Sequence, residues 1–523
     1  MPLTRWWGKA RELAGAPRTR GLGVTAEEWR QCAADVAASG GRLLAMWAST
    51  CNERDGADTL EIEDIYAESP AAGAAHDAAS PTTDIYAAFL IDRGVLILEL
   101  SAWRALMPPA ERPDYPGIEA LFPCAARMQR ALFDLSGMRS SDPDHRPWLR
   151  HPPQGYEFVR VAGEGVHEIA VGPVHAGTIE PGHFRFSVVG EKVLRLEERL
   201  GYTHKAIERR FTELPLLEGH GLAARIAGDS AVAHSWAYCQ ALEGMAGCVI
   251  PPRAAALRAL FLELERIANH LGDVGALAND AGFAFGLSQF SRLKEQLLRG
   301  VSQSLGQRYL LDAVVPGGTA VDISADGCRR LDAAIAAIRH ESAELRAIYE
   351  DHAGVRDRFT GAGILMPELA LRLGVLGLVG RASGQALDAR IDFACAPYDA
   401  LPPARVVRQE GDVAARVTVR FEELAESCRL ARCLLATLPP GHHLGSIQAP
   451  ADRSFATGLI EGWRGPVFVA LEAGPAGTTR RCHPHDPSWQ NWPALEHAIL
   501  GNIVADFPLI NKSFNLAYSG VDL

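Results

Sequence analysis

Two long stretches of the chain repeat apolar residues at the spacing of an α-helix, and they constrain the fold more than any other feature. They run from Ala254 to His270 and from Gly327 to Ile348. Helices of this length cannot bury their apolar faces alone, so each requires helical neighbours. The pattern therefore predicts a central helical bundle in the second half of the chain.

The first part of the chain has a different pattern. Val24 to Trp47 has helical spacing with Thr25 as N-cap, and Tyr86 to Leu100 is rich in Ile, Leu and Val, which indicates two strands joined by a turn. A further helix is predicted from Phe122 to Leu135. The run Ser140 to Pro153 contains four prolines and is typical of a linker.

These patterns predict an α+β protein of two domains. The chain has 523 residues, which is too many for one hydrophobic core. We expect an α/β domain at residues 1–150, with the linker at its end. A second domain at residues 151–523 is expected to contain a small β region, strand-like from Val159 to Leu196, followed by the helical bundle. Beyond Pro397 the pattern is mixed, with a strand at Val467 to Leu471, a helix at Pro493 to Ile503 and a short irregular tail.

Charge and cysteine usage exclude several classes of protein. The formal net charge is −11 and no basic cluster stands out, so a nucleic-acid partner is not expected. No stretch approaches the roughly 18 apolar residues that span a bilayer, and no apolar region follows the basic N-terminal residues. We expect a cytoplasmic chain that reaches a membrane only through partner subunits. The ten cysteines are scattered and contain no C-x-x-C pair, which excludes a disulfide framework.

Four separated segments carry a family resemblance. They are Gly172 to Phe186, Leu200 to Glu208, Leu264 to Leu271, and Asp506 to Leu509. In order and spacing, over residues 165–523, they resemble the large subunits of complex I and of membrane-bound, energy-converting nickel–iron hydrogenases of the formate hydrogenlyase type.

The N-terminal part is similar to the smaller complex I subunit that is often fused ahead of this one. The similarity rests on Phe122-Pro123 and on Arg130 to Gly137. A helix with a glycine cap explains the same segment.

The resemblance implies a metal position without metal ligands. Nickel–iron hydrogenases hold their metals with two C-x-x-C pairs, because thiolates are soft, strongly donating ligands. In this chain the first pair falls at Ala227 and Ser230, and the second at Ala517 and Gly520. All four thiols are missing, so we expect neither a nickel–iron centre nor hydrogen activation.

The resemblance to complex I implies a quinone site in the emptied cavity. His175 matches the loop histidine that bonds the quinone head, and Asp280 matches the aspartate near it. Gly228 falls at the position of the family's tyrosine, which puts proton delivery in doubt. The candidate cavity residues are His183, Gly228, Asp229 and His234.

Each of these residues also has a structural interpretation. His175 and His183 would satisfy backbone groups of a glycine-rich loop. Asp229 and Ser230 would cap a helix beginning near Ala231, and His234 would be a buried packing residue. Two further sets of polar residues are expected to be purely structural: an ion-paired set of His204, Lys205 and Glu208, and a surface loop that carries His483 and His485.

The resemblance therefore implies an oxidoreductase subunit of a membrane-associated, NADH dehydrogenase-like complex in electron transport. It implies that the chain binds no cofactor of its own, that an iron–sulfur cluster lies in a small partner subunit, and that quinone is a candidate acceptor. Further partners would be antiporter-type membrane subunits that translocate ions. The alternative is a redox-inactive scaffold subunit of such a complex.

Overall fold

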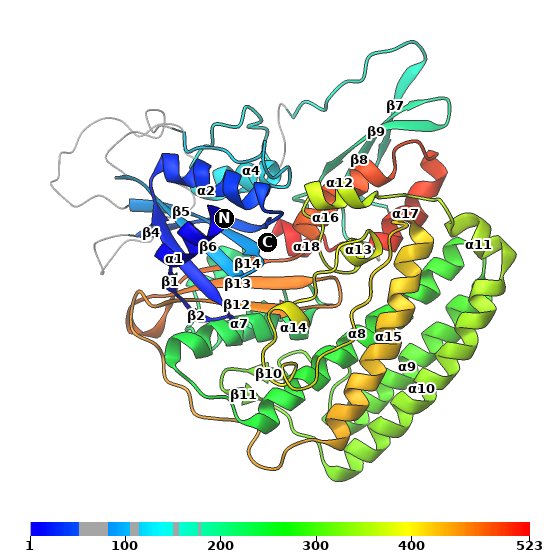
Figure 1. The fold of residues 1–523 in the computed structure, drawn as a ribbon. Helices are drawn as coiled ribbons and strands as arrows, with labels where there is room; N and C mark the ends of the chain where they lie inside the picture. Colours follow the sequence, from blue (N-terminus) through cyan, green and yellow to red (C-terminus); the bar gives the residue numbers. More distant parts are fainter. Residues whose placement is uncertain (1, 52–81, 105–113, 150–155, 176–178) are drawn as a thin grey trace.

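The computed structural model describes residues 2–51, 82–104, 114–149, 156–175 and 179–523. A five-stranded sheet forms the N-terminal part (Figure 1). Its strands, in spatial order, are β1 (Arg11–Glu12), β3 (Thr19–Val24), β6 (Gly94–Arg104), β5 (Thr82–Ile91) and β4 (Arg42–Cys51). Only the β3–β6 pair is parallel among these neighbours. The predicted strand pair around Asp92 to Gly94 is confirmed.

Three helices accompany this sheet: α1 (Pro2–Lys9), α2 (Ala26–Ala38) and α4 (Ala125–Ser136). Thr25 caps α2 through a reciprocal capping box with Glu28, as the sequence indicates. The helix predicted to continue to Trp47 ends at Ala38, because the chain turns at Gly40 and Gly41 and enters β4 at Arg42.

A second, four-stranded sheet lies between the N-terminal sheet and the helical bundle. Its order is β14 (Thr479–His485), β13 (Pro466–Ala473), β12 (Phe455–Glu461) and β2 (Ala14–Gly15). An apolar cluster that includes Trp47, Ile97 and Phe468 packs the two sheets together. α7 (Ala231–Ala246) packs on β12 and β13, and its backbone comes so close that a Cβ on Gly458 would lie 1.8 Å from the carbonyl oxygen of Ala237.

The predicted helical bundle is present. α8 (Pro252–Asp280), α9 (Ala284–Leu305), α10 (Ala325–Asp351) and α15 (Val413–Ala436) pack side by side. The smaller elements are α5 (Ile207–Thr212), α6 (Gly219–Ala223), α11 (Ala353–Phe359), α12 (Pro367–Arg372), α13 (Gly377–Ala382), α14 (Ala389–Asp392) and the hairpin of β10 (Val314–Val315) and β11 (Gly318–Thr319). None of the helices in the described ranges has the length and apolarity that crossing a bilayer demands.

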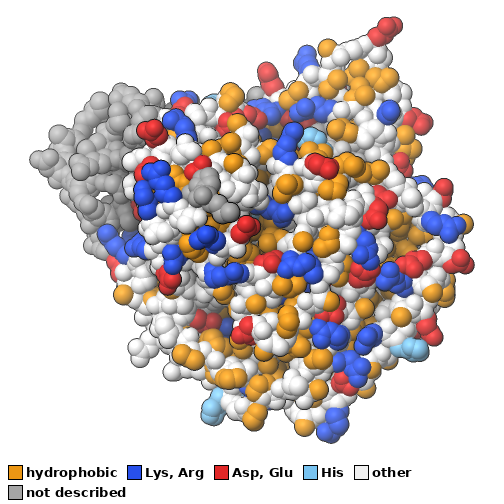
Figure 2. Space-filling view, in the orientation of Figure 1, with side chains coloured by type: hydrophobic (Ala, Val, Ile, Leu, Met, Phe, Trp, Pro, Cys, Tyr) orange, Lys and Arg blue, Asp and Glu red, His pale blue; other side chains and the backbone are white. Residues whose placement is uncertain are grey.

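A three-stranded antiparallel sheet projects from the body of the molecule: β7 (Val166–Val171), β8 (His183–Val189) and β9 (Lys192–Arg199). The C-terminal segment contains α16 (Ser488–Ala498), α17 (Phe507–Phe514) and α18 (Ser519–Asp522), with short 3-10 turns at Pro475–Gly477 and Val504–Asp506. The tail expected to be irregular is therefore helical and buried. Figure 2 shows basic and acidic side chains interspersed over one face of the molecule.

The described part of the predicted linker, Ser140 to Leu149, is packed rather than loose. Ser140 and Trp148 are buried, and the guanidinium of Arg199 donates to the carbonyl oxygen of Trp148 at 2.8 Å. Residues 150–153 lie outside the described ranges. That residues 1–150 form a separable domain stays a prediction, which limited proteolysis would test.

Candidate functional site

The first of the two positions matched to metal-binding motifs lies directly before α7. Ala227 and Ser230 are both buried there, and His234 follows one turn into the helix. Arg464, in the turn between β12 and β13, reaches this position from the opposite side. Its guanidinium lies 3.2 Å from Ser230 Oγ and 2.7 Å from Asp229 Oδ1. The ion pair of Arg464 and Asp229 therefore lies against the first motif.

The second motif, Ala517 to Gly520, runs into α18 and is held by a different set of contacts. Ser488 Oγ accepts the backbone N–H of Ala517 at 3.0 Å, and the indole of Trp492 donates to the Ala517 carbonyl at 3.1 Å. Arg464 Nε also donates to the carbonyl oxygen of Asn515 at 2.5 Å. Arg464 thus links the first motif to the segment just before the second.

Asp486 fills the space in front of Gly520. A Cβ on Gly520 would lie 2.9 Å from Asp486 Cγ and 3.0 Å from its Oδ2. The backbone N–H of Ser488 donates to Oδ1 at 2.8 Å, and His234 Nε2 lies 3.4 Å from Oδ2. Burial alone would raise the pKa of Asp486, but His234 and the charge of Arg464 lower it to about 2, so this carboxylate is ionised.

These residues do not fit a nickel–iron centre. Three of the four positions, Ala227, Ala517 and Gly520, lack any side-chain donor, and the fourth is serine. A side chain at position 520 would also collide with Asp486. Within the described ranges, no group of three or more His, Cys, Asp or Glu side chains is arranged to hold a metal ion.

The loop before β8 lies against the second motif. Glu180 accepts the backbone N–H of Ser519 at 3.1 Å, and a Cβ on Gly182 would meet the ring of Tyr518. His175 and His183 come together in this loop, where His175 Nε2 lies 2.8 Å from the Gly182 carbonyl and His183 Nδ1 lies 3.3 Å from the Gly172 carbonyl.

Both histidines thus have the predicted structural role as backbone partners. Burial lowers the pKa of His183. Ala176 to Thr178 of this loop lie outside the described residues.

Asp280 ends α8 and has its own partner. The ammonium of Lys512, on α17, lies 2.6 Å from Asp280 Oδ1. The nearby Asp273 accepts from Asn515 at 2.7 Å, which also ties α8 to the segment before the second motif. Asp280 and His175 are thus each held by a different group, and none of the described contacts joins them.

Gly228 and Asp229 border a cavity of about 160 Å³ whose wall is formed by α8 and α9. A Cβ on Gly228 would meet nothing within 4 Å, so open space stands where the family's tyrosine would be. Glu265 also lines this cavity and accepts the backbone N–H of Val232 at 2.8 Å. Burial, followed by the charge of Asp229, raises its pKa to about 8.

The helix predicted to begin near Ala231 is confirmed, but its cap differs from the prediction. Ser230 is the N-cap residue and makes no side-chain capping bond. Glu265 accepts the N–H groups of Val232 and Ala233 in its place. His234 is fully buried, as predicted.

Two structural interpretations from the sequence are wrong. His483 and His485 are buried in β14, because that strand pairs along its whole length with β13. Glu208 does not pair with His204 or Lys205: its partners are Arg481 and His483. α5 begins only at Ile207, so the helical spacing needed for those pairs is absent. The sequence did not predict roles for Arg464, Asp486 and Glu265. Each contacts residues that are distant in the chain, so its role depends on the folded structure.

Comparison with known proteins places these features in a family. The sequence profile described as respiratory-chain NADH dehydrogenase, 49 Kd subunit, matches residues 280–457. Formate hydrogenlyase subunit 5 of Escherichia coli is 29% identical over 441 residues, which cover 79% of this chain and 78% of that protein. The carbon monoxide-induced hydrogenase of Rhodospirillum rubrum is 31% identical over 353 residues, covering 67% of this chain and 97% of that protein.

A further relative and a solved structure extend the comparison. The NADH-quinone oxidoreductase C/D protein of Bacteroides thetaiotaomicron is 25% identical over 468 residues, covering 81% of this chain and 88% of that protein. A chain of the membrane-bound sulfane sulfur reductase, described as an archaeal respiratory membrane complex, shares the fold. The TM-score is 0.64 at 24% identity, over 70% of this chain and all of that one.

Proposed function

The chain belongs to the family of complex I 49-kDa subunits and the large subunits of membrane-bound hydrogenases, and from this membership we propose that it works as the large subunit of an electron-transferring membrane complex. Electrons arrive from an iron–sulfur cluster in a small partner subunit. Antiporter-type membrane subunits use the energy for ion translocation. The chain lies on the cytoplasmic face of the membrane and attaches to it through these partners.

The observation that carries this proposal is the charged network at the emptied metal position. Arg464 joins Asp229 to Asn515, just before the second motif, and Asp486 occupies the space in front of Gly520. A position filled in this way has no place for a metal, so the electrons would go to an external acceptor. The chain therefore holds no nickel–iron centre.

A quinone head is the acceptor that we propose. The open space at Gly228 and the contact of the His175 loop with the second motif support a binding face at this point. His175 would release the Gly182 carbonyl and donate to a quinone oxygen, because reduction of a quinone requires groups that supply protons and can be reprotonated. Asp280, freed from Lys512, would orient that histidine.

The test compares electron transfer with assembly in one preparation of the complex. His175→Ala should reduce quinone-linked electron transfer at least tenfold and leave assembly unchanged. His167→Ala is the matched control, since His167 is an exposed histidine of the same small sheet. Unchanged activity in His175→Ala would remove His175 from the site. Elemental analysis should find no stoichiometric nickel, and one nickel per chain would contradict the proposal.

The second candidate function is a redox-inactive scaffold. It is favoured by the fact that His175 and Asp280 both have structural partners, the Gly182 carbonyl and Lys512. On this alternative, His175→Ala lowers assembly and electron transfer to the same extent.

A further inference from the structure

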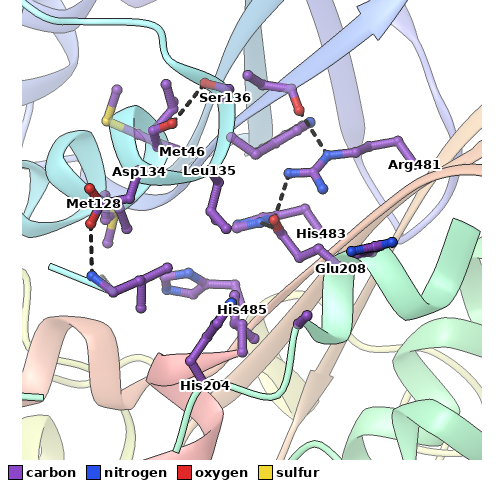
Figure 3. Close-up of a pocket in the computed structure, with 18 of the residues that line it drawn as sticks. Met46, Met128, Asp134, Leu135, Ser136, His204, Glu208, Arg481, His483 and His485 are labelled. Carbon is purple, nitrogen blue, oxygen red and sulfur yellow. Dashed lines mark hydrogen bonds and ion pairs between the residues drawn. The ribbon is translucent and has the colours of Figure 1, made fainter. Parts of the chain in front are cut away.

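A second cavity is distinct from the one bordered by Gly228, since the two share no lining residue. It has a volume of about 320 Å³ and is enclosed by β4 and α4 of the N-terminal part, by α5 and by β14 (Figure 3). The apolar wall includes Met46, Trp47, Met128, Leu135 and Trp489. Its volume and mixed apolar and polar lining are those of a small-molecule site.

His483 presents an unpartnered nitrogen at this cavity. Its Nδ1 lies 2.6 Å from Glu208 Oε1, and Glu208 also accepts from Arg481 at 2.9 Å. Burial alone would raise the pKa of Glu208, but Arg481 and His483 lower it to about 2, so the carboxylate is ionised and can only accept. His483 Nδ1 therefore carries the proton and Nε2 carries a lone pair. Among the described residues, this buried Nε2 has no hydrogen-bond partner.

His485 lines the same cavity and also has one ring nitrogen that donates within the protein, although here it is Nε2 rather than Nδ1. Its Nε2 lies 3.0 Å from Gln490 Oε1. The Gln490 amide nitrogen donates to the carbonyl oxygens of Leu43 and Leu44, which fixes the amide oxygen as the atom that faces His485. His485 Nε2 is therefore the donor and Nδ1 bears the lone pair. Burial lowers the pKa of His485 to about 3, so the ring stays neutral.

The third histidine of the cavity, His204, follows this pattern. Its Nδ1 lies 2.7 Å from the carbonyl oxygen of Asp522, which accepts only, so Nδ1 is the donor there. Each of the three rings thus uses one N–H within the protein. Burial lowers the pKa of both His483 and His485, so these two neutral rings each keep an acceptor nitrogen. The three rings do not form a metal site, since no such cluster exists in the described ranges. An anion is disfavoured as well, because the three arginines of the lining are each paired with a carboxylate: Arg209 with Glu213, Arg480 with Asp452 and Arg481 with Glu208.

The walls of the cavity add a shape preference. Trp47 stacks on His483 with ring centroids 5.4 Å apart and 16° between the planes, and Trp489 stacks on His485 at 6.2 Å and 18°. We propose that this cavity binds a small, flat, ring-containing molecule that carries O–H or N–H donors. The molecule would donate these hydrogens to His483 Nε2 and His485 Nδ1. The proposal is independent of the quinone face, because it involves none of the residues assigned there.

Calorimetric titration of the full chain tests whether the ligand needs a hydrogen-bond donor. The probes represent the two kinds of ring that carry such donors, phenols and amino-heterocycles. Hydroquinone is compared under argon with its dimethyl ether, 1,4-dimethoxybenzene, and 9-methyladenine with 9-methylpurine, which lacks the amino group and has no other N–H. We expect one donor-bearing probe to bind about tenfold more tightly than its donor-free analogue, because an unpaired buried acceptor gains a hydrogen bond. The pair that shows the difference identifies the source.

Leu135→Trp locates the binding, since a larger side chain at this half-exposed position of α4 fills the cavity mouth. Leu121→Trp is the control: Leu121 is 38% exposed against 37% for Leu135, and it does not line the cavity. Binding should be lost in the first variant and kept in the second. If the melting temperature of Leu135→Trp falls below that of Leu121→Trp, Ala131→Phe is used instead to fill the cavity.

Three results would overturn the proposal. The first is equal affinity of probe and analogue in both pairs, and the second is no binding of either donor-bearing probe. The third is undiminished binding in a folded, cavity-filling variant.

Discussion

Gly520→Ala tests whether Asp486 occupies the emptied metal position. The added Cβ would lie 2.9 Å from Asp486 Cγ and 3.0 Å from both its Cβ and its Oδ2, whereas ordinary carbon contacts begin near 3.5 Å. Asp486 would have to retreat by about half an ångström. It is anchored by the Ser488 N–H at 2.8 Å and lies beside His234, so the retreat would strain both contacts. Overpacking of this kind costs about 1–3 kcal/mol of unfolding free energy.

The matched control is Gly228→Ala, at the other emptied motif. Its Cβ would meet nothing within 4 Å, so the change should stay within about 0.5 kcal/mol. Urea titration followed by both circular dichroism and tryptophan fluorescence gives the free energy of unfolding, provided that the two transitions coincide.

A double-mutant cycle assigns the cost to Asp486. In an Asp486→Gly background, Gly520→Ala should cost less than about 0.5 kcal/mol, since the atoms it would approach are gone; the coupling energy would then be about 1 kcal/mol or more. If Gly520→Ala costs no more than Gly228→Ala in the wild-type background, the reasoning about this position is refuted.

Two further predictions concern buried charge. Arg381→Met should lower the free energy of unfolding by about 3–5 kcal/mol in the same titration. Arg381 binds Glu423 at 2.6 Å and Glu461 at 2.7 Å, and both carboxylates would lose this buried partner. The control Arg299→Met, at an exposed arginine, should cost less than about 1 kcal/mol. Burial raises the pKa of Glu265 to about 8, so the folded state keeps a proton that the unfolded state releases near pH 4.5. Stability should therefore fall as pH rises from about 5 to 8, and Glu265→Gln should flatten that dependence; a wild-type slope retained in the variant would contradict the assignment.

Periodicity predicted the parts of this fold that depend on local pattern. The bundle helices α8 and α10 appear where apolar spacing placed them, and β5 and β6 appear on either side of the turn at Asp92. Such elements follow from which face of a segment is apolar, and that is legible in one sequence.

The elements that were missed depend on distant partners. The segment Ser519–Asp522 lacks a periodic pattern, yet it is buried as α18 because Asp522 accepts the backbone N–H groups of Gly201 and Thr203. His483 resembled a loop residue beside Pro484, although its environment is set by Glu208, some 275 residues earlier in the chain.

The candidate site shows the same division. Alignment on motifs matched Ala227, Ser230, Ala517 and Gly520 to the family's metal-ligand positions, because missing thiols can be read directly from a sequence. What lies between these positions could not be read in this way. Arg464 and Asp486 lie outside both motifs and reach the site only after β12, β13 and β14 assemble.

The short strand β2 has a consequence for how the chain is made. Ala14 pairs in parallel with Ala456, and Gly15 with Thr457, so roughly 440 residues separate the two sides of this contact. A ribosome that extends the chain at about 5–20 residues per second needs on the order of half a minute to a minute and a half between them. During that interval the edge that β2 later protects cannot form. The four-stranded sheet can therefore be completed only after β12, Phe455–Glu461, has been synthesised.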